Sequence, residues 1–264
     1  MITRLESRVA AGYAEPEAMS LLAKARVSFG VALGHLLPEE RLATAARWTG
    51  RALRIAWHLG DRQMLAFVLR MHGNELRKAR HPAVGIVRLQ QALRIDDHPA
   101  RKGAGLVLLA RAAAEAGEPD LFDAAAGQCV RALDAAGEDV LFSAFTVREV
   151  RLRGLLATGR AAEAADLAGN DVAGAGPPTP QWRVIEQITT AEVLARAGDQ
   201  QTAAGLLSAA IGDAETLRLP HQVQRTFTNS NMRTGRGAAT GLARRRDLAR
   251  RGPTGRDRGP FPIR

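Results

Sequence analysis

The sequence predicts an all-α protein in which antiparallel helix hairpins stack in a row as a solenoid. Three observations lead to this prediction. The composition favours helix over sheet, prolines and glycines fall at regular positions where helices would begin and end, and a short motif recurs at intervals of about 40 residues. The elements that this prediction requires can be identified one after another along the chain.

Composition sets the fold class. The chain has 264 residues, of which 46% are hydrophobic and only 4% are aromatic. Alanine makes up about a fifth of the chain and β-branched residues are sparse. Alanine is the best helix former, and strands favour β-branched and aromatic side chains, so this balance indicates helices. The length suffices for a sizeable core.

Prolines and glycines divide the chain into about ten predicted helices. Proline is tolerated in the first turn of a helix, where its missing N–H would lack a partner anyway. Gly60-Asp61 and Gly198-Asp199 each combine a residue suited to a left-handed helix end with a carboxylate suited to capping the next helix. The predicted helices are 16–36, 39–59, 61–79, 82–96, 99–117, 119–136, 143–159, 161–171, 180–197 and 200–218. They would pair into about five hairpins.

The repeat is visible at the ends of the first helices of these hairpins. The triplets KAR (78–80), EAG (115–117), ATG (157–159) and RAG (196–198) recur at intervals of 37, 42 and 39 residues. Small residues precede three of these marks at Gly73, Ala110 and Ala191, and Ala92, Ala132 and Ala210 follow three of them. A hairpin cannot bury its apolar stripe alone, so we expect neighbouring copies to stack and to bury these small residues.

One copy carries a pattern that resembles a known family. The spacing of Ala191, Leu194, Gly198, Ala203 and Ala210 resembles the tetratricopeptide repeat. The segments LAFVLRMHGNELRKA, FTVREVRLRGLLATG and PQWRVIE resemble the C-terminal repeat regions of actinobacterial Xre-type transcriptional regulators. The resemblance implies a right-handed superhelix over residues 15–225, preceded by a lead segment, 1–14, and it implies binding of proteins or peptides.

The resemblance also implies a binding groove, because the first helix of each tetratricopeptide hairpin lines the concave face. The residues at these positions are Arg70, Asn74, Arg77, Lys78, Arg111, Arg153, Glu192 and Arg196. Guanidinium groups can offer two parallel hydrogen bonds to a carboxylate, so the expected partner is an acidic or carboxyl-terminated peptide or protein. The alternative is that these side chains are only the solvated face of amphipathic helices.

Catalytic and metal-binding motifs are absent from the sequence. Its six histidines show no i, i+4 pair, and neither HExxH nor CxxC occurs. Cys129 stands among apolar residues and is expected to be a buried structural thiol. We therefore predict a protein that is not an enzyme and has no catalytic residues, metal or cofactor. A single cysteine and the lack of a long apolar segment favour a cytoplasmic protein that does not enter a membrane.

The last segment, 226–264, differs from the rest. It holds ten arginines against Asp247 and Asp257, so it carries +8 of the net charge of +10. It lacks apolar periodicity and is predicted to be disordered, and LRLPHQVQR (217–225) is predicted to lead into no closing helix. Two interpretations remain open. The segment is either a basic arm that binds DNA weakly or the product of a frameshift near residue 226.

The sequence thus predicts a protein-interaction module, a scaffold or sensor in regulation, that binds a peptide, a protein or a second copy of itself. The alternative is a transcriptional regulator, or its effector domain, whose helix-turn-helix DNA-binding part is missing from this chain. DNA would then be contacted only through that absent part or weakly through the basic tail.

Overall fold

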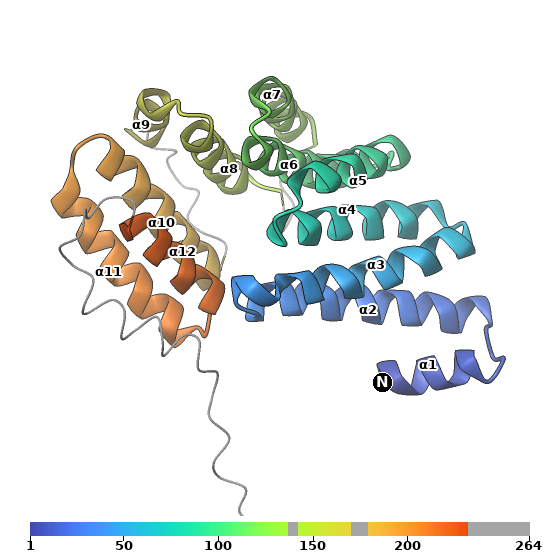
Figure 1. Ribbon diagram of the computed structural model, residues 1–264. Helices are drawn as coiled ribbons and strands as arrows, with labels where there is room; N and C mark the ends of the chain where they lie inside the picture. Colours follow the sequence, from blue (N-terminus) through green and yellow to red (C-terminus); the bar gives the residue numbers. More distant parts are fainter. Residues whose placement is uncertain (137–141, 170–178, 232–264) are drawn as a thin grey trace, which may run out of the picture.

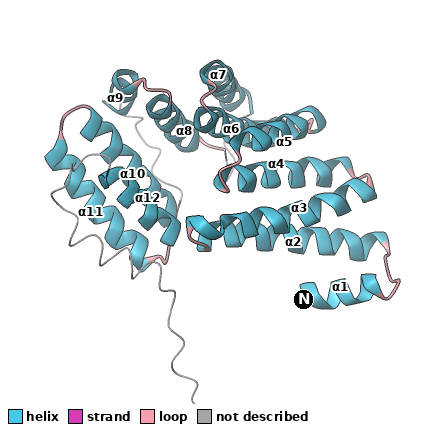
Figure 2. Cartoon of the chain, viewed as in Figure 1, coloured by secondary structure: helices cyan, strands magenta, loops and turns pink. Residues whose placement is uncertain are grey.

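The computed structural model describes residues 1–136, 142–169 and 179–231, and this part of the chain is helical throughout its regular elements (Figure 2). The prediction of an all-α protein is confirmed. The elements are α1 (Ile2–Ala10), α2 (Pro16–Leu36), the short 3-10 helix η1 (Glu39–Arg41), α3 (Leu42–Leu59), α4 (Arg62–Lys78), α5 (Pro82–Ile95), α6 (Pro99–Ala116), α7 (Pro119–Ala136), α8 (Ala144–Ala157), α9 (Ala161–Gly169), α10 (Pro180–Arg196), α11 (Gln200–Thr216) and α12 (Pro220–Asn231).

The helix boundaries follow the residues that predicted them. Proline occupies the first turn of α2, α5, α6 and α10. Gly60 ends α3 with a φ of 68°, and Gly198 follows α10 with a φ of 99°. The carboxylates of Asp61 and Asp199 accept hydrogen bonds from the backbone N–H groups of Met64 and Thr202, as N-caps do. These short turns let consecutive helices fold back onto each other.

Small residues lie where neighbouring helices approach most closely. A Cβ added to Gly73 would stand 2.8 Å from the Leu89 Cγ and 3.0 Å from the carbonyl oxygen of Gly85. Helices α4 and α5 therefore pack at a distance that only glycine allows. Ala92, Ala110, Ala191 and Ala210 are buried as expected, whereas Ala132 is only partly buried against the largest apolar cluster. Most of the small residues of the sequence lattice are therefore part of the core.

The core consists of several apolar clusters rather than one. The largest lies between α6, α7 and α8, where Phe122 and Phe142 are almost completely buried. A second cluster joins α2, α3 and α4 around Leu22 and Leu69, and two smaller ones lie in α10 to α12. Cys129 is buried in the largest cluster, as predicted. Each cluster is shared by helices that are close in the sequence, so burial is local along the chain.

Two elements in the N-terminal part of the chain differ from the sequence-based prediction. The predicted helix 39–59 begins with the 3-10 turn η1 and becomes an α-helix only at Leu42. Such tighter turns are frequent at the N-termini of α-helices. The lead segment 1–14 contains helix α1, whose Ile2, Leu5 and Val9 pack against the cluster of α2 to α4. Apolar periodicity gives its weakest signal at helix ends and in short terminal helices.

The prediction that 217–225 leads into no closing helix is wrong. Helix α12 begins at Pro220 and runs to Asn231, and its Val223 is buried with Leu219 against α10 and α11. Packing against these helices stabilises a segment whose composition alone did not indicate a helix. Residues 226–231 of the predicted disordered tail belong to α12, and 232–264 lie outside the described residues.

The C-terminal helices meet the N-terminal ones. One end of α12 contacts α2, left of the centre of the view in Figure 1. The backbone N–H of Glu39 donates a hydrogen bond of 2.7 Å to Gln224 Oε1, and the Gln224 amide donates to the Glu40 carboxylate. Gln181 at the start of α10 lies 3.0 Å from His35 Nδ1 near the end of α2. The inner ends of distant helices are thereby held together.

Candidate functional site: a charged inner face

Helices α4, α6, α8, α10 and α12 contribute charged side chains to one connected surface, here called the inner face. On α4, Arg77 is nearly buried, and its Nη1 donates to Glu115 Oε1 of α6 at 2.5 Å. Its Nε and Nη2 both donate to the side-chain oxygen of Asn74, at 3.2 and 3.1 Å. Asn74 therefore orients the guanidinium of Arg77 toward Glu115.

The charge of Glu115 depends on its arginine neighbours. Burial opposes its ionisation, but Arg77, Arg153 and Arg111 outweigh this effect and hold the pKa of the Glu115 carboxyl below its usual value. Glu115 is thus an anion at neutral pH, and its negative charge is already paired with Arg77 of the inner face.

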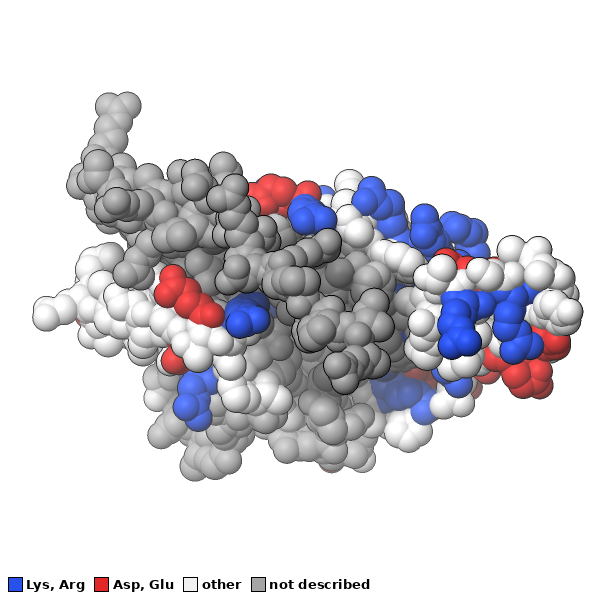
Figure 3. Space-filling view, turned by 90° about the horizontal axis from the view of Figure 1, so that it is seen from below, with Lys and Arg blue, Asp and Glu red and all other residues white. Residues whose placement is uncertain are grey.

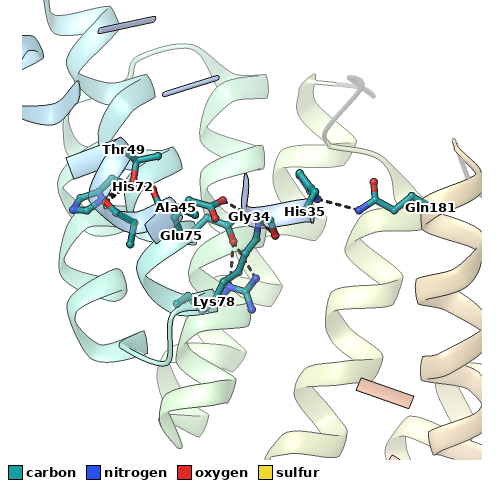
Figure 4. A network of polar contacts seen from close by, with 11 residues as sticks. Gly34, His35, Ala45, Thr49, His72, Glu75, Lys78 and Gln181 are labelled. Carbon is teal, nitrogen blue, oxygen red and sulfur yellow. Dashed lines mark hydrogen bonds and ion pairs between the residues drawn. The ribbon is translucent and has the colours of Figure 1, made fainter. Parts of the chain in front are cut away.

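A buried ion pair closes the inner face between α2 and α4 (Figure 4). Lys78 Nζ lies 2.8 Å from Glu75 Oε1 and 3.4 Å from the carbonyl oxygen of Gly34. Burial raises the pKa of Glu75 and lowers that of Lys78, while each charge opposes the shift of the other. A Cβ at Gly34 would overlap with the Glu75 carboxylate, so the pair packs directly against the backbone of α2 at this residue.

Between α8 and α10 the inner face is a chain of hydrogen bonds. The buried Glu149 accepts a hydrogen bond of 2.9 Å from the Thr189 hydroxyl and lies 3.8 Å from Arg153 Nε. Arg225 of α12 donates to the same Thr189 oxygen at 3.0 Å. This chain attaches α12 to α8 through α10.

Glu192 and Arg196 form the next part of the inner face. Arg196 Nη2 lies 2.8 Å from Glu192 Oε1, and Arg196 Nη1 donates to the backbone oxygen of Leu156 at 3.0 Å. Arg225 Nη2 lies 3.9 Å from Glu192 Oε2. Helix α10 is therefore tied by charged side chains to both α8 and α12.

Arg111 of α6 differs from these arginines. Across the described ranges its side chain makes no hydrogen bond or ion pair, and its Nε is buried without a partner. Burial, followed by the nearby charges of Arg77 and Arg153, lowers the pKa of Arg111 well below its usual value, although Glu149 and Glu115 oppose the shift. Arg111 borders a cavity of about 130 Å³ between α6, α8, α10 and α12.

Most of the residues proposed from the sequence lie on this inner face. Six of them take part in the contacts just described, namely Asn74, Arg77, Lys78, Arg153, Glu192 and Arg196, and Arg111 borders the cavity. Arg70 is the exception, because its Nη1 donates to the backbone oxygen of Arg101 at the start of α6, and its guanidinium lies 5.9 Å from the centre of the Phe67 ring. Arg70 thus joins α4 to α6 beside the inner face.

The sequence analysis missed five members of the inner face: Glu75, Glu115, Glu149, Thr189 and Arg225. Two of the carboxylates could have been found from i, i+3 and i, i+4 spacing, since Glu75 precedes Lys78 and Glu149 precedes Arg153 on the same helical face. Arg225 was assigned to the end of the repeat domain, next to the predicted tail, and only helix α12 brings it to α8 and α10.

Other kinds of site receive no support from the geometry. In the described ranges no three His, Cys, Asp or Glu side chains gather closely enough to hold a metal ion. Burial raises the pKa of the Cys129 thiol to about 12, which makes it a poor nucleophile. Figure 3 shows both basic and acidic side chains among neutral ones on the face that it draws. None of the described helices combines the length and the apolarity needed to cross a bilayer.

The comparisons with known proteins add no relationship. No protein-family model, no characterised protein and no solved structure matches the chain.

Proposed function

We propose that this chain is a non-enzymatic protein-interaction module of the tetratricopeptide-like kind, which binds a peptide or protein partner along its inner face. In this proposal about five helix hairpins form a right-handed superhelix. The first helix of each hairpin, α2, α4, α6, α8 or α10, contributes to the inner face. The scaffold would act in regulation, in the cytoplasm, as a monomer or as a homodimer.

Contacts that recur at the repeat length support the proposed stacking. Arg77 contacts Glu115 of the next inner helix, 38 residues on. Thr189 and Glu149 are separated by 40 residues, as are Arg196 and Leu156. These separations match the recurrence of the sequence motif, as expected where successive units stack on one another.

The observation that carries the proposal is a ladder of equivalent positions. Asn74, Arg111, Arg153 and Glu192 each stand six residues before the last residue of the repeat mark on α4, α6, α8 and α10. Three of the four border the same cavity, and Asn74 orients the Arg77 that holds Glu115 on its wall. A continuous polar strip across successive helices offers an extended chain repeated places to bind.

The charge of this strip favours an acidic partner. Arg153 and Arg196 are already near glutamates of their own helices, whereas Arg111 makes no such contact within the described ranges. A carboxylate of the partner would satisfy this cation through charge-assisted hydrogen bonds.

The proposal can be tested with three pools of fluorescein-labelled peptides, one rich in Asp and Glu, one neutral and one rich in Lys and Arg. We expect the acidic pool to bind the full chain in fluorescence polarisation. The charge reversal Arg111→Glu should weaken that binding by about tenfold or more, because it replaces the attractive cation with an anion.

Arg131→Glu is the matched control, because Arg131 is exposed on α7, away from the inner face. It should bind the acidic pool as the unaltered chain does. Equal binding of the acidic pool by Arg111→Glu and by the unaltered chain would refute the role of the inner face.

A further inference from the structure

Charged side chains of both signs line the cavity between α6, α8, α10 and α12, and the positive ones outnumber the negative ones. It is bordered by the guanidinium groups of Arg111, Arg153 and Arg225 and by the carboxylates of Glu115 and Glu192, and its volume is about 130 Å³. A single water needs only roughly 10–15 Å³ of such space, so the cavity has room for a small polyatomic ion.

Both carboxylates of the wall are held by arginines that do not border the cavity. Glu115 accepts the hydrogen bond of Arg77, and Glu192 lies 2.8 Å from Arg196. Arg153 is 3.8 Å from Glu149, which also accepts from Thr189. Around the cavity, five arginines thus face three glutamates, which leaves two positive charges uncompensated.

The uncompensated charge is concentrated in two side chains. Among the described residues, Arg111 has a buried Nε without a partner and Arg225 has a buried Nη1 without one, while Oε2 of the nearby Glu149 is buried without a partner as well. Arg225 is only 13% exposed, and its closest carboxylate, that of Glu192, lies 3.9 Å away. Burial and then the charge of Arg153 lower the pKa of Arg225 to about 10, so the surroundings disfavour its cation. Buried guanidinium groups normally have both an opposite charge and satisfied hydrogen bonds.

We propose that this cavity is a binding site for one compact oxyanion, a carboxylate or a phosphate group, held between Arg111 of α6 and Arg225 of α12. Planar guanidinium groups match the oxygens of such anions and can bind them with two parallel hydrogen bonds. The anion supplies the negative charge that the protein lacks at this place, and Arg153 adds to the attraction.

The position of Arg225 gives the site a second property. Because Arg225 belongs to α12, an anion in the cavity connects this helix to α6 in addition to the contacts that Thr189 and Glu192 provide. Occupation of the site therefore strengthens the docking of α12. This inference shares Arg111 with the proposed function but does not require a peptide or protein partner. Anion binding without peptide binding, or the reverse, distinguishes the failure of one proposal from the failure of the other.

The test uses the full chain and two probes, inorganic phosphate and succinate, each titrated at constant ionic strength with sodium chloride as the balancing salt. Isothermal calorimetry and the thermal midpoint are measured together, because a ligand that binds only the folded state raises the midpoint in a saturable way. Saturable binding of phosphate identifies a phosphate group as the ligand chemistry, and saturable binding of succinate identifies a carboxylate.

Two variants and a control locate the binding. Arg111→Met and Arg225→Met keep most of the side-chain volume and remove the charge, and each should weaken anion binding by about tenfold or more. Arg131→Met, on the outer side of α7, should bind as the unaltered chain does. Two independent variants are used so that one remains informative if the other folds poorly.

Hydrogen exchange supplies the readout for α12. The bound anion should slow amide exchange in α12 of the unaltered chain and should leave that exchange unchanged in Arg225→Met. The proposal is overturned if neither probe binds saturably, or if both variants bind as tightly as the control.

Discussion

The inner face is built differently at its two ends. Between α2 and α4 it is closed, since the Glu75–Lys78 pair is buried and Gly34 lies directly against the Glu75 carboxylate. Between α6, α8 and α12 it is open, with a cavity of about 130 Å³ bordered by Arg111, whose buried Nε has no partner among the described residues. The same row of inner helices therefore contains a region of paired charges and a region with an excess of positive charge.

This difference shows what decides the role of a charged residue on these helices. The residue is paired within the protein, or its charge remains able to bind a ligand, depending on its neighbours on the same and on adjacent helices. Lys78 has Glu75 three residues earlier on the same helix, and its ammonium group pairs with Glu75 Oε1, although Glu75 Oε2 is buried without a partner among the described residues. Arg111 has Glu115 one turn later, but Arg77 of α4 already occupies that carboxylate. Counting the charges of one helix would not have separated the two cases.

The largest effect is expected from breaking the closed region. Glu75→Gln leaves Lys78 buried beside a neutral amide, and loss of one partner from a buried ion pair costs about 3 kcal/mol or more. Urea unfolding followed by circular dichroism should show this loss in the free energy of unfolding.

The double variant Glu75→Leu with Lys78→Met is the matched control, because apolar replacement of both partners is often neutral or stabilising. It should recover most of the stability lost in Glu75→Gln. A single variant as stable as the unaltered chain would show that this pair is not what closes the inner face.

A smaller effect is expected at the wall of the open region. A Cβ at Gly154 of α8 would overlap with the buried Phe122 ring of α7, so Gly154→Ala forces the ring or the helix to shift. Overpacking of this kind costs about 1–3 kcal/mol, which thermal unfolding can measure.

The comparison for Gly154 is Gly205→Ala on α11, where a Cβ would meet nothing within 4 Å. That change should stabilise the chain by about 0.5–1 kcal/mol, since alanine favours the helix. If the two alanine variants have equal thermal midpoints, the close packing beside the cavity is not as described.

A further effect concerns pH and His72 of α4, which contacts α3. Burial, followed by the charge of Arg88, lowers the pKa of His72 from 6.5 to about 4, and its Nδ1 lies 2.9 Å from the Thr49 hydroxyl oxygen. Between pH 4 and 6.5 the unfolded chain binds a proton that the folded chain does not, so stability rises with pH across this window. Because His72 is only partly buried, we expect a loss of about 1–2 kcal/mol on acidification from pH 7 to 4.

This contribution is isolated by comparison with His72→Gln. The variant should show a shallower fall in unfolding free energy between pH 6.5 and 4 than the unaltered chain, with no difference in slope above pH 7. Parallel curves for the two proteins would exclude His72 as a source of the pH dependence.

The sequence predicted the helices well where local chemistry determines them. Pro16, Pro82, Pro99 and Pro180 open helices as expected, and Gly60 with Asp61 forms the predicted turn. These signals depend on the backbone of a few adjacent residues, which is why they can be read without the rest of the molecule. Helix α12 was not predicted, because it is stabilised by burial of Val223 and Leu219 against α10 and α11.

The candidate site was predicted only in part for a related reason. Periodicity indicated which face of α4, α6, α8 and α10 carries Asn74, Arg111, Arg153 and Glu192, because side-chain direction repeats every 3.6 residues. It did not indicate that Arg77 would contact Glu115 or that Arg225 would reach Thr189, since such pairs depend on the register between helices.

The sequence by itself determined that this protein is helical, where most of its helices begin and end, and which small residues are buried, because each of these properties follows from local backbone preferences and apolar periodicity. Only the tertiary structure decided which charges neutralise one another, that α12 folds back to α2, and that Arg111 and Arg225 border one cavity. Those outcomes depend on distances between residues far apart in the chain, which are set by how the helices pack.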